Sequence, residues 1–212
     1  MRKLVWGIPI RLFHWVLFGL ISFSFYTGEF GDFESIDNHM IAGYGVIGLV
    51  IFRIIFGLVG HGHIRFTEFV RGPSAIVNYI KHPTATTGHN PLGALAIIAL
   101  LTSLGIQAGT GLFTTDEIFV EGPLYHLVND DTASLLSQVH SINRWILLAL
   151  ISLHLCAVAH HEIWRKEKIV GAMFHGKKET GEDKPDQSHQ IGLAVVCGLV
   201  ATAVVWYGVN HL

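Results

Sequence analysis

Charged residues are scarce in this chain, at 14% of 212 residues, whereas 50% of the residues are hydrophobic. Soluble domains usually carry about 25% charged residues, so this scarcity argues against a soluble protein. The formal net charge of -2 shows no basic excess, which excludes a nucleic-acid partner. The only cysteines, Cys156 and Cys197, both fall in apolar runs, so neither a disulfide framework nor a C-x-x-C-H motif is present.

Long apolar runs are what the chain has in abundance. A membrane-spanning helix needs about 20 mostly apolar residues. We predict five such helices, at residues 10–27, 39–60, 91–112, 140–163 and 190–209. The expected fold class is therefore all-α, a transmembrane helical bundle with a four-helix core and a fifth C-terminal helix. We expect one domain at residues 1–178, followed at residues 179–212 by a polar linker and the additional helix.

The connecting segments differ in the sign of their charge. Residues 28–38 and 113–139 contain Asp and Glu but no Lys or Arg. Apart from Arg144, the basic residues lie at the N-terminus, around residues 61–90 or after Trp164. The positive-inside rule therefore predicts a cytoplasmic N-terminus, two acidic loops on the outer side and a periplasmic C-terminus.

Histidine is unusually frequent, with fourteen in the chain. His140 and His154 lie fourteen residues apart on one predicted helix, so they return to nearly the same face about 21 Å apart. The predicted topology places His39 near the outer side and His14 near the inner side. We therefore expect an outer pair, His39 with His140, and an inner pair, His14 with His154.

Ionisable groups are costly within a membrane and usually serve a function there. An imidazole bound to iron through one nitrogen can donate its other N–H to a carbonyl or hydroxyl, which removes that cost. Two axial histidines leave haem iron without an open position, which favours electron transfer over oxygen chemistry. The four histidines thus predict axial ligation of two non-covalent haem b groups, although any one of them could instead be a hydrogen-bonded bundle residue.

Other histidines remain alternatives for the inner pair. His89 and His161 both lie near the inner side, and either could replace a proposed ligand there. A zinc site built from several histidines is a further alternative, but no H-E-x-x-H or C-x-x-C spacing supports it.

Three arginines are candidates for binding the propionates of the haems. Arg144 is the one basic residue predicted on the outer side, and it follows His140 by one helical turn. Arg53 and Arg11 lie near the inner side, where they could bind the inner haem or extend toward lipid headgroups.

A glycine motif, G-x-G-x-x-G at Gly43, Gly45 and Gly48, lies inside the second predicted helix. No strand precedes it, so it is not a dinucleotide-binding fingerprint. Small residues there let a flat macrocycle or another helix come close. The third helix carries three glycines that could do the same, although plain helix packing is the simpler interpretation there: Gly105, Gly109 and Gly111.

Several motifs together resemble the prokaryotic cytochrome b561 family, whose members include the cytochrome b subunits of nickel-iron hydrogenases. The resemblance covers about residues 4–178, and the cytochrome subunits of membrane formate dehydrogenases are similar but less close. The motifs are R-L-F-H-W (11–15), His39-x-x-x-Gly43, Arg53-x-x-x-Gly57-x-x-Gly60, R-F-T-E-F-V-R-G-P (65–73), G-H-N-P-L-G (88–93), H-S-I-N-R-W (140–145) and H-L-C-A-V (154–158).

The resemblance implies a di-haem cytochrome of the bacterial inner membrane, in which His14, His39, His140 and His154 match the family's haem ligands. It implies electron transfer between the quinone pool and a periplasmic c-type cytochrome, dehydrogenase or hydrogenase subunit. The protein would then be an electron carrier or a subunit of a quinone-linked oxidoreductase, with no catalytic residue of its own. Alternatives are a stand-alone quinone reductase that oxidises a small donor such as superoxide, a one-haem anchor subunit and a histidine-rich metal transporter.

Overall fold

The structure is a computed structural model that describes residues 2–31, 35–82, 90–116, 120–179 and 190–212. It contains five long helices with the length and apolar composition needed to cross a membrane. The shortest has 21 residues and spans about 31 Å, close to the thickness of the hydrocarbon core. The predicted all-α bundle is confirmed. The helices are α1 (Ile8–Phe30), α2 (Ile36–Val59), α5 (Pro91–Gly111), α6 (Asp130–Ile163) and α8 (Gln190–His211).

Helix α6 begins ten residues before the predicted start at residue 140. The reason is a local capping signal. The side chain of Asn129 accepts a hydrogen bond from the Thr132 backbone N–H at 2.9 Å, and Asp130 and Asp131 occupy the first turn. Both features favour a helix N-terminus. The prediction that residues 130–139 belong to a loop was therefore wrong.

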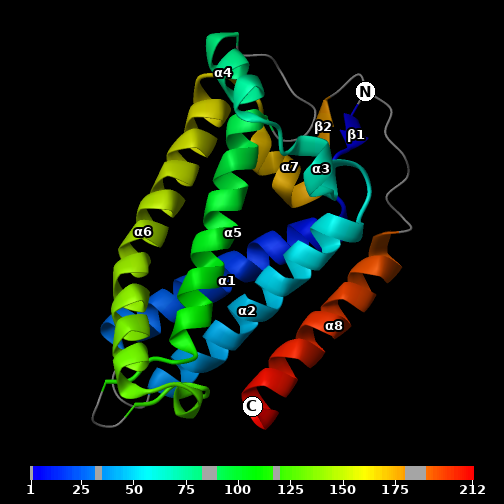
Figure 1. Ribbon diagram of the computed structural model, residues 1–212. Coiled ribbons are helices and arrows are strands. Elements are labelled where there is room, and N and C mark those ends of the chain that lie inside the picture. Colours follow the sequence, from blue (N-terminus) through cyan, green and yellow to red (C-terminus); the bar gives the residue numbers. More distant parts are fainter. Residues whose placement is uncertain (1, 32–34, 83–89, 117–119, 180–189) are drawn as a thin grey trace.

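Helix α2 is the central element of the bundle. It packs against α1, α5 and α8, whereas α6 packs chiefly on α5. Figure 1 shows α8 at the edge of the molecule, alongside α2. Small residues of α8 face α2, since Ala194, Cys197 and Ala201 are all buried. Side chains of this size let two spanning helices approach closely.

The two ends of the bundle differ in structure (Figure 1). At one end, called the sheet end here, strand β1 pairs with the antiparallel strand β2. At the opposite end, called the loop end, His126 Nε2 donates a hydrogen bond to the Leu212 backbone oxygen at 2.7 Å. The remaining short elements are β1 (Arg2–Leu4), β2 (Lys177–Glu179), η2 (Gly62–Ile64), α3 (Phe66–Phe69), α4 (Pro73–Lys81) and α7 (Ile169–His175) at the sheet end, and η3 (Tyr125–Leu127) at the loop end.

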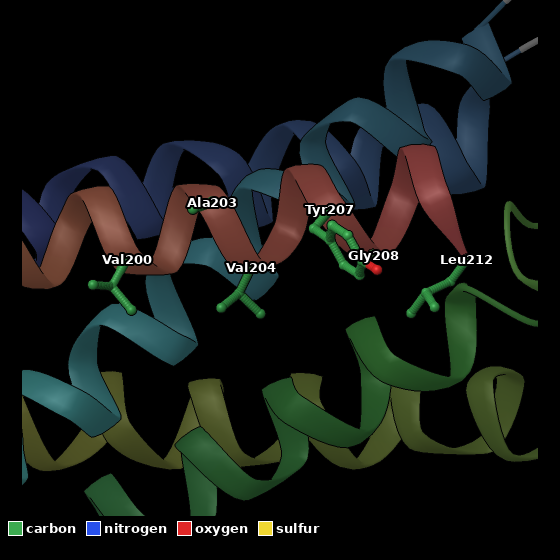
Figure 2. Close-up of a pocket in the computed structure, with 6 residues that line it drawn as sticks. All are labelled: Val200, Ala203, Val204, Tyr207, Gly208 and Leu212. Atoms are coloured by element: carbon green, nitrogen blue, oxygen red, sulfur yellow. The ribbon is translucent and has the colours of Figure 1, made fainter.

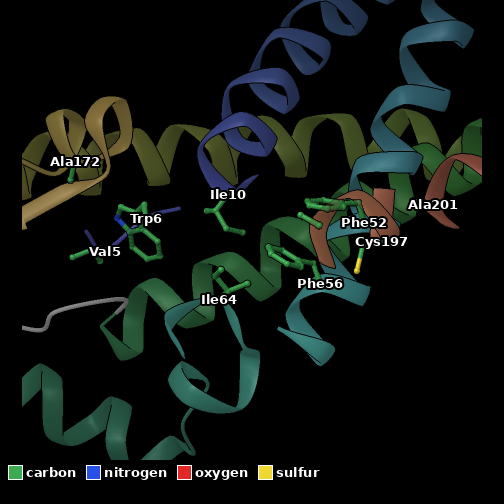
Figure 3. Packing of buried hydrophobic residues seen from close by; sticks show 10 residues of the cluster. Val5, Trp6, Ile10, Phe52, Phe56, Ile64, Ala172, Cys197 and Ala201 are labelled. Carbon is green, nitrogen blue, oxygen red and sulfur yellow. The ribbon is translucent and has the colours of Figure 1, made fainter. Parts of the chain in front are cut away.

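The largest buried cluster joins the N-terminal segment, α2 and α8 near the sheet end (Figure 3). Phe56 and Phe52 stack with ring centroids 5.3 Å apart, and Phe56 is fully buried. A second cluster lies between α2, α5 and α6 and consists of Val46, Val50, Leu104 and Leu147. Apolar packing therefore fixes the helices on which the histidines lie.

Candidate functional site

His39 of α2 and His140 of α6 face each other near the loop end. Their ring centroids are 6.3 Å apart and their planes make an angle of 76°. A metal–imidazole bond is about 2 Å long, and the ring centroid lies about 1 Å beyond the bound nitrogen. Two imidazoles on opposite sides of one iron therefore have centroids about 6 Å apart. The spacing of this pair fits axial ligation of a haem iron.

Both rings of this loop-end pair are held in the same way. His39 Nδ1 lies 2.8 Å from the Ser24 carbonyl oxygen, and His140 Nδ1 lies 2.8 Å from the Gln107 carbonyl oxygen. Because a carbonyl oxygen can only accept, each Nδ1 must carry the proton. Each Nε2 then keeps its lone pair for a metal. A hydrogen bond on the second ring nitrogen is the usual support of a metal-binding histidine.

His14 of α1 and His154 of α6 form the second pair, toward the sheet end. The two side chains are close enough to interact electrostatically. His14 Nδ1 is buried and has no hydrogen-bond partner among the described residues. A buried polar atom without a partner costs free energy, and a metal ion or a hydrogen-bond acceptor bound at this nitrogen would remove that cost. The structure thus brings together both pairs that the sequence predicts.

The alternative inner ligands are placed differently. His161 Nδ1 lies 3.2 Å from Glu167 Oε2, so this ring has an acidic neighbour after the end of α6. His160 stacks on Trp164 with ring centroids 5.5 Å apart. His89 lies outside the described residues. In the described part of the chain, no group of three or more His, Cys, Asp or Glu side chains could hold a metal ion.

Arg53 is the most buried cation near the sheet end, with 4% of its surface exposed. Its guanidinium lies 4.5 Å from the centre of the Phe66 ring. Its Nη1 has no hydrogen-bond partner within the described residues. A buried guanidinium with an unused donor favours an anion close by, since an unpaired buried charge is costly. A haem propionate is an anion of this kind.

Arg144 has a partner that the sequence did not predict. Its Nη1 lies 2.5 Å from Glu29 Oε2, with each side chain 32% exposed. Its Nε is buried and has no hydrogen-bond partner among the described residues, so one donor is left for another acceptor. Arg11 likewise donates from Nη1 to the Phe174 carbonyl at the end of α7, and its Nε has no hydrogen-bond partner in the part of the chain that the structure describes.

Comparison with known proteins decides the family. Residues 5–176 match the family described as prokaryotic cytochrome b561. The chain belongs to this family. The cytochrome is 24% identical to a probable Ni/Fe-hydrogenase B-type cytochrome subunit of Azotobacter chroococcum mcd 1, over 86% of this chain and 90% of that protein. It is 22% identical to a protein of the same description from Rhodobacter capsulatus, over 85% and 82% of the two chains. No solved structure matches the chain significantly.

Membership in the family establishes the broad function of this cytochrome. It is a multi-pass membrane protein that binds haem b and transfers electrons. Haem iron ligated on both faces undergoes one-electron oxidation and reduction without binding oxygen. For His39 and His140, the ring separation and the carbonyl-bound Nδ1 atoms are compatible with holding such a group.

A polar network beside His140 was missed in the sequence. Asn143 is buried in the cytochrome, and its Nδ2 donates to the Ser103 carbonyl at 2.9 Å and to Gln107 Oε1 at 2.8 Å. The Ser103 hydroxyl donates in turn to Asn143 Oδ1 at 3.1 Å. This network joins α5 to α6 and holds the same Gln107 whose carbonyl binds His140. The sequence shows polar residues on both helices but not which faces meet.

Two glycines lie against the loop-end histidines. A Cβ atom on Gly28 would be 2.8 Å from His39 Cε1, and one on Gly111 would be 3.0 Å from His140 Cε1. Gly111 therefore leaves room for the His140 ring rather than for a neighbouring helix. Within the glycine motif of α2, Gly45 lies against Leu20 of α1 and Gly48 lies near Val205 of α8. Those two glycines allow helices to approach, which is one of the two interpretations of the motif given above.

An apolar pocket of about 490 Å³ lies along α8 (Figure 2). Its lining contains one polar side chain, that of Tyr207, and no charged one, so it suits a lipid acyl chain better than an anion. Neither histidine pair lines it. The lining residues are Val200, Ala203, Val204, Tyr207, Gly208 and Leu212.

Proposed function

We propose that this cytochrome carries two non-covalent haem b groups and passes electrons across the bacterial inner membrane. His39 and His140 would ligate one group, and His14 and His154 the other. The observation that carries this proposal is the loop-end pair, whose 6.3 Å ring separation and two carbonyl-bound Nδ1 atoms fit ligation through Nε2. The haem groups would supply the one-electron chemistry, and the residues of the chain hold and orient them.

The second group is supported by the spacing along α6. His140 and His154 belong to one continuous helix, and fourteen residues correspond to a rise of about 21 Å. His140 faces His39 of α2, and His154 lies close enough to His14 of α1 for the two side chains to interact electrostatically. Two haem sites at this separation in height would cover most of the hydrocarbon core, which is about 30 Å thick. We propose residues 1–178 as the haem-binding unit, with α8 as an accessory helix.

Charge segregation supports a cytoplasmic sheet end. Basic side chains such as Arg65, Arg71 and Lys168 lie toward that end, whereas Glu121 and Asp131 lie toward the loop end. The positive-inside rule then places the N-terminus in the cytoplasm and the C-terminus of α8 in the periplasm. In this orientation the pair formed by His39 and His140 is the outer one.

The acidic loop end is our proposed docking face for a periplasmic electron-transfer partner with a basic surface. The names of the relatives make a hydrogenase subunit the first partner to test, with a c-type cytochrome or another dehydrogenase as alternatives. Membrane quinone would exchange electrons with the other haem. This assignment gives each end of the cytochrome one reaction partner.

Liposomes test the proposed electron transfer across the membrane directly. Haem-loaded cytochrome is reconstituted without quinone into vesicles that contain ferricyanide, and dithionite is added outside. We expect reduction of the internal ferricyanide at a rate that rises with the amount of wild-type protein. His154→Ala should abolish this rate, and protein-free vesicles give the background. A fully haem-loaded wild type that stays at background would refute electron transfer across the membrane.

A further inference from the structure

The two loop-end histidines rest on the same five-residue pattern, which occurs on two different helices. On α1 the pattern is S-F-Y-T-G at residues 24–28, and on α5 it is Q-A-G-T-G at residues 107–111. In each, the first residue supplies the carbonyl, the fourth is Thr and the fifth is Gly. We call each of these segments an imidazole seat.

The carbonyl of each seat accepts from two side chains at once. Ser24 O lies 2.8 Å from His39 Nδ1 and 3.2 Å from Thr27 Oγ1. Gln107 O lies 2.8 Å from His140 Nδ1 and 3.1 Å from Thr110 Oγ1. Each threonine hydroxyl has a single proton. It shares this proton between the carbonyl of the seat and the carbonyl of the residue just before the seat, Phe23 or Ile106. A carbonyl oxygen has two lone pairs, so it can accept from a threonine and a histidine together, and the threonine weakens it as an acceptor for the histidine.

The glycine of each seat gives the ring access to that carbonyl. A Cβ atom on Gly28 would lie 2.8 Å from His39 Cε1 and 2.9 Å from Nδ1. On Gly111 the corresponding distances to His140 are 3.0 Å and 3.3 Å. If a carbonyl holds one ring nitrogen and a metal holds the other, the ring cannot rotate away from an added Cβ without weakening one of those two bonds. Alanine would therefore weaken the histidine hydrogen bond or displace the ring, more severely at residue 28.

We propose that Thr27 with Gly28, and Thr110 with Gly111, are positioning residues that set the ring orientation and redox potential of the loop-end haem. The inference rests on the proposed ligation by His39 and His140. A strong acceptor at Nδ1 makes an imidazole more basic, which stabilises ferric iron and lowers the potential. A threonine that shares the acceptor moderates this effect. The glycine fixes the ring plane, and the two seats together set the planes 76° apart.

The pattern is confined to the loop-end pair among the described residues. His14 Nδ1 has no hydrogen-bond partner there, so His14 of the sheet-end pair has no equivalent support. Helical threonines often bond to the carbonyl four residues earlier, and a single occurrence would carry little weight. Here both members of one facing pair use the same carbonyl, threonine and glycine positions. The two seats differ in the hydroxyl nearest to each Nδ1, which is that of Ser24 at 3.4 Å from His39 and that of Thr110 at 3.3 Å from His140. A seat variant should therefore affect one haem and leave the other as an internal reference.

The test uses the full-length haem-loaded protein, redox titration of each haem and electron paramagnetic resonance of the ferric state. Thr27→Val and Thr110→Val should retain both haems and shift the loop-end potential downward, and Thr→Ser at the same positions should restore it. Gly28→Ala should change the resonance anisotropy of that haem or release it, with Gly111→Ala milder. Gly198→Ala on α8, where no atom lies within 4 Å of the added Cβ, is the matched control.

Wild-type potentials and resonance signals in the Thr→Val and Gly→Ala variants would overturn the seat proposal while leaving the two-haem assignment intact. A wild-type protein without a haem at the loop end would instead overturn the proposed function, and this is measured before any variant is made. Failure of Gly28→Ala to fold would leave the Thr→Val titrations to decide, because valine preserves the shape of threonine.

Discussion

The imidazole rings of His39 and His140 face each other across the bundle, 6.3 Å apart between centroids, and each donates from Nδ1 to a backbone carbonyl of a third or fourth helix. Four helices thus contribute to one site, two with ligands and two with carbonyls. Each Nε2 keeps its lone pair, which the proposed ligation of haem iron would use.

Replacing His154 with alanine should remove one haem while the loop-end haem persists. The variant deletes one ligand of the sheet-end pair but leaves His39 and His140 untouched. Haem content should fall from two to one per chain, as measured by the pyridine haemochrome method. The control is His160→Ala, whose ring stacks on Trp164 and which should keep both haems. Retention of two haems in His154→Ala would show that another residue ligates the sheet-end haem.

Arg53 should stabilise the reduced state of the sheet-end haem. Its guanidinium is buried, and its Nη1 has no partner in the described part of the chain. A cation near iron favours the reduced form. Arg53→Gln should lower that haem's potential by some tens of millivolts, on the order expected for a buried charge about 10 Å away. Arg53→Lys should lower it less. The exposed Arg71, whose Nη2 donates to the Glu68 carbonyl, gives a matched Arg→Gln control. If Arg53→Gln and Arg71→Gln shifted the potential of this haem equally, the effect would not come from the buried position of Arg53.

Arg144 and Glu29 should act in opposite directions on the loop-end haem. Arg144→Gln removes a cation and should lower the potential, whereas Glu29→Gln removes an anion and should raise it. Each shift should be roughly a few tens of millivolts, because the partly exposed pair is screened by water. The double variant should lie close to the wild type, as redox titration can show. Shifts of the same sign in both single variants would contradict this charge argument.

Asn143 should stabilise the contact between α5 and α6. Asn143→Ala leaves the Ser103 hydroxyl and Gln107 Oε1 without this partner in a buried position. We expect a loss of about 1–2 kcal/mol in the free energy of unfolding. The measurement is reversible unfolding in mixed micelles, with Ser141→Ala on an exposed face of the same helix as control. A stability equal to that of the control would mean that the network contributes nothing to helix association.

The sequence predicted the features that depend on composition and helical repeat. Long apolar runs gave the five spans, and the fourteen-residue interval between His140 and His154 gave the expectation of two layers. The start of α6 was missed because the Asn129 cap lies inside an acidic segment that resembles a loop. A sequence alone also does not show how each helix is rotated about its axis. For that reason the Glu29 partner of Arg144 and the network around Asn143 emerged only from the structure.

Counting haem per chain tests the central claim most directly. The protein is purified from cells supplied with iron and a haem precursor, and haem b is quantified against protein concentration by the pyridine haemochrome method. Our account predicts two haem b groups per wild-type chain and one in each of the His39→Ala and His154→Ala variants. A colourless wild-type preparation, or one haem that survives loss of either histidine pair, would contradict it.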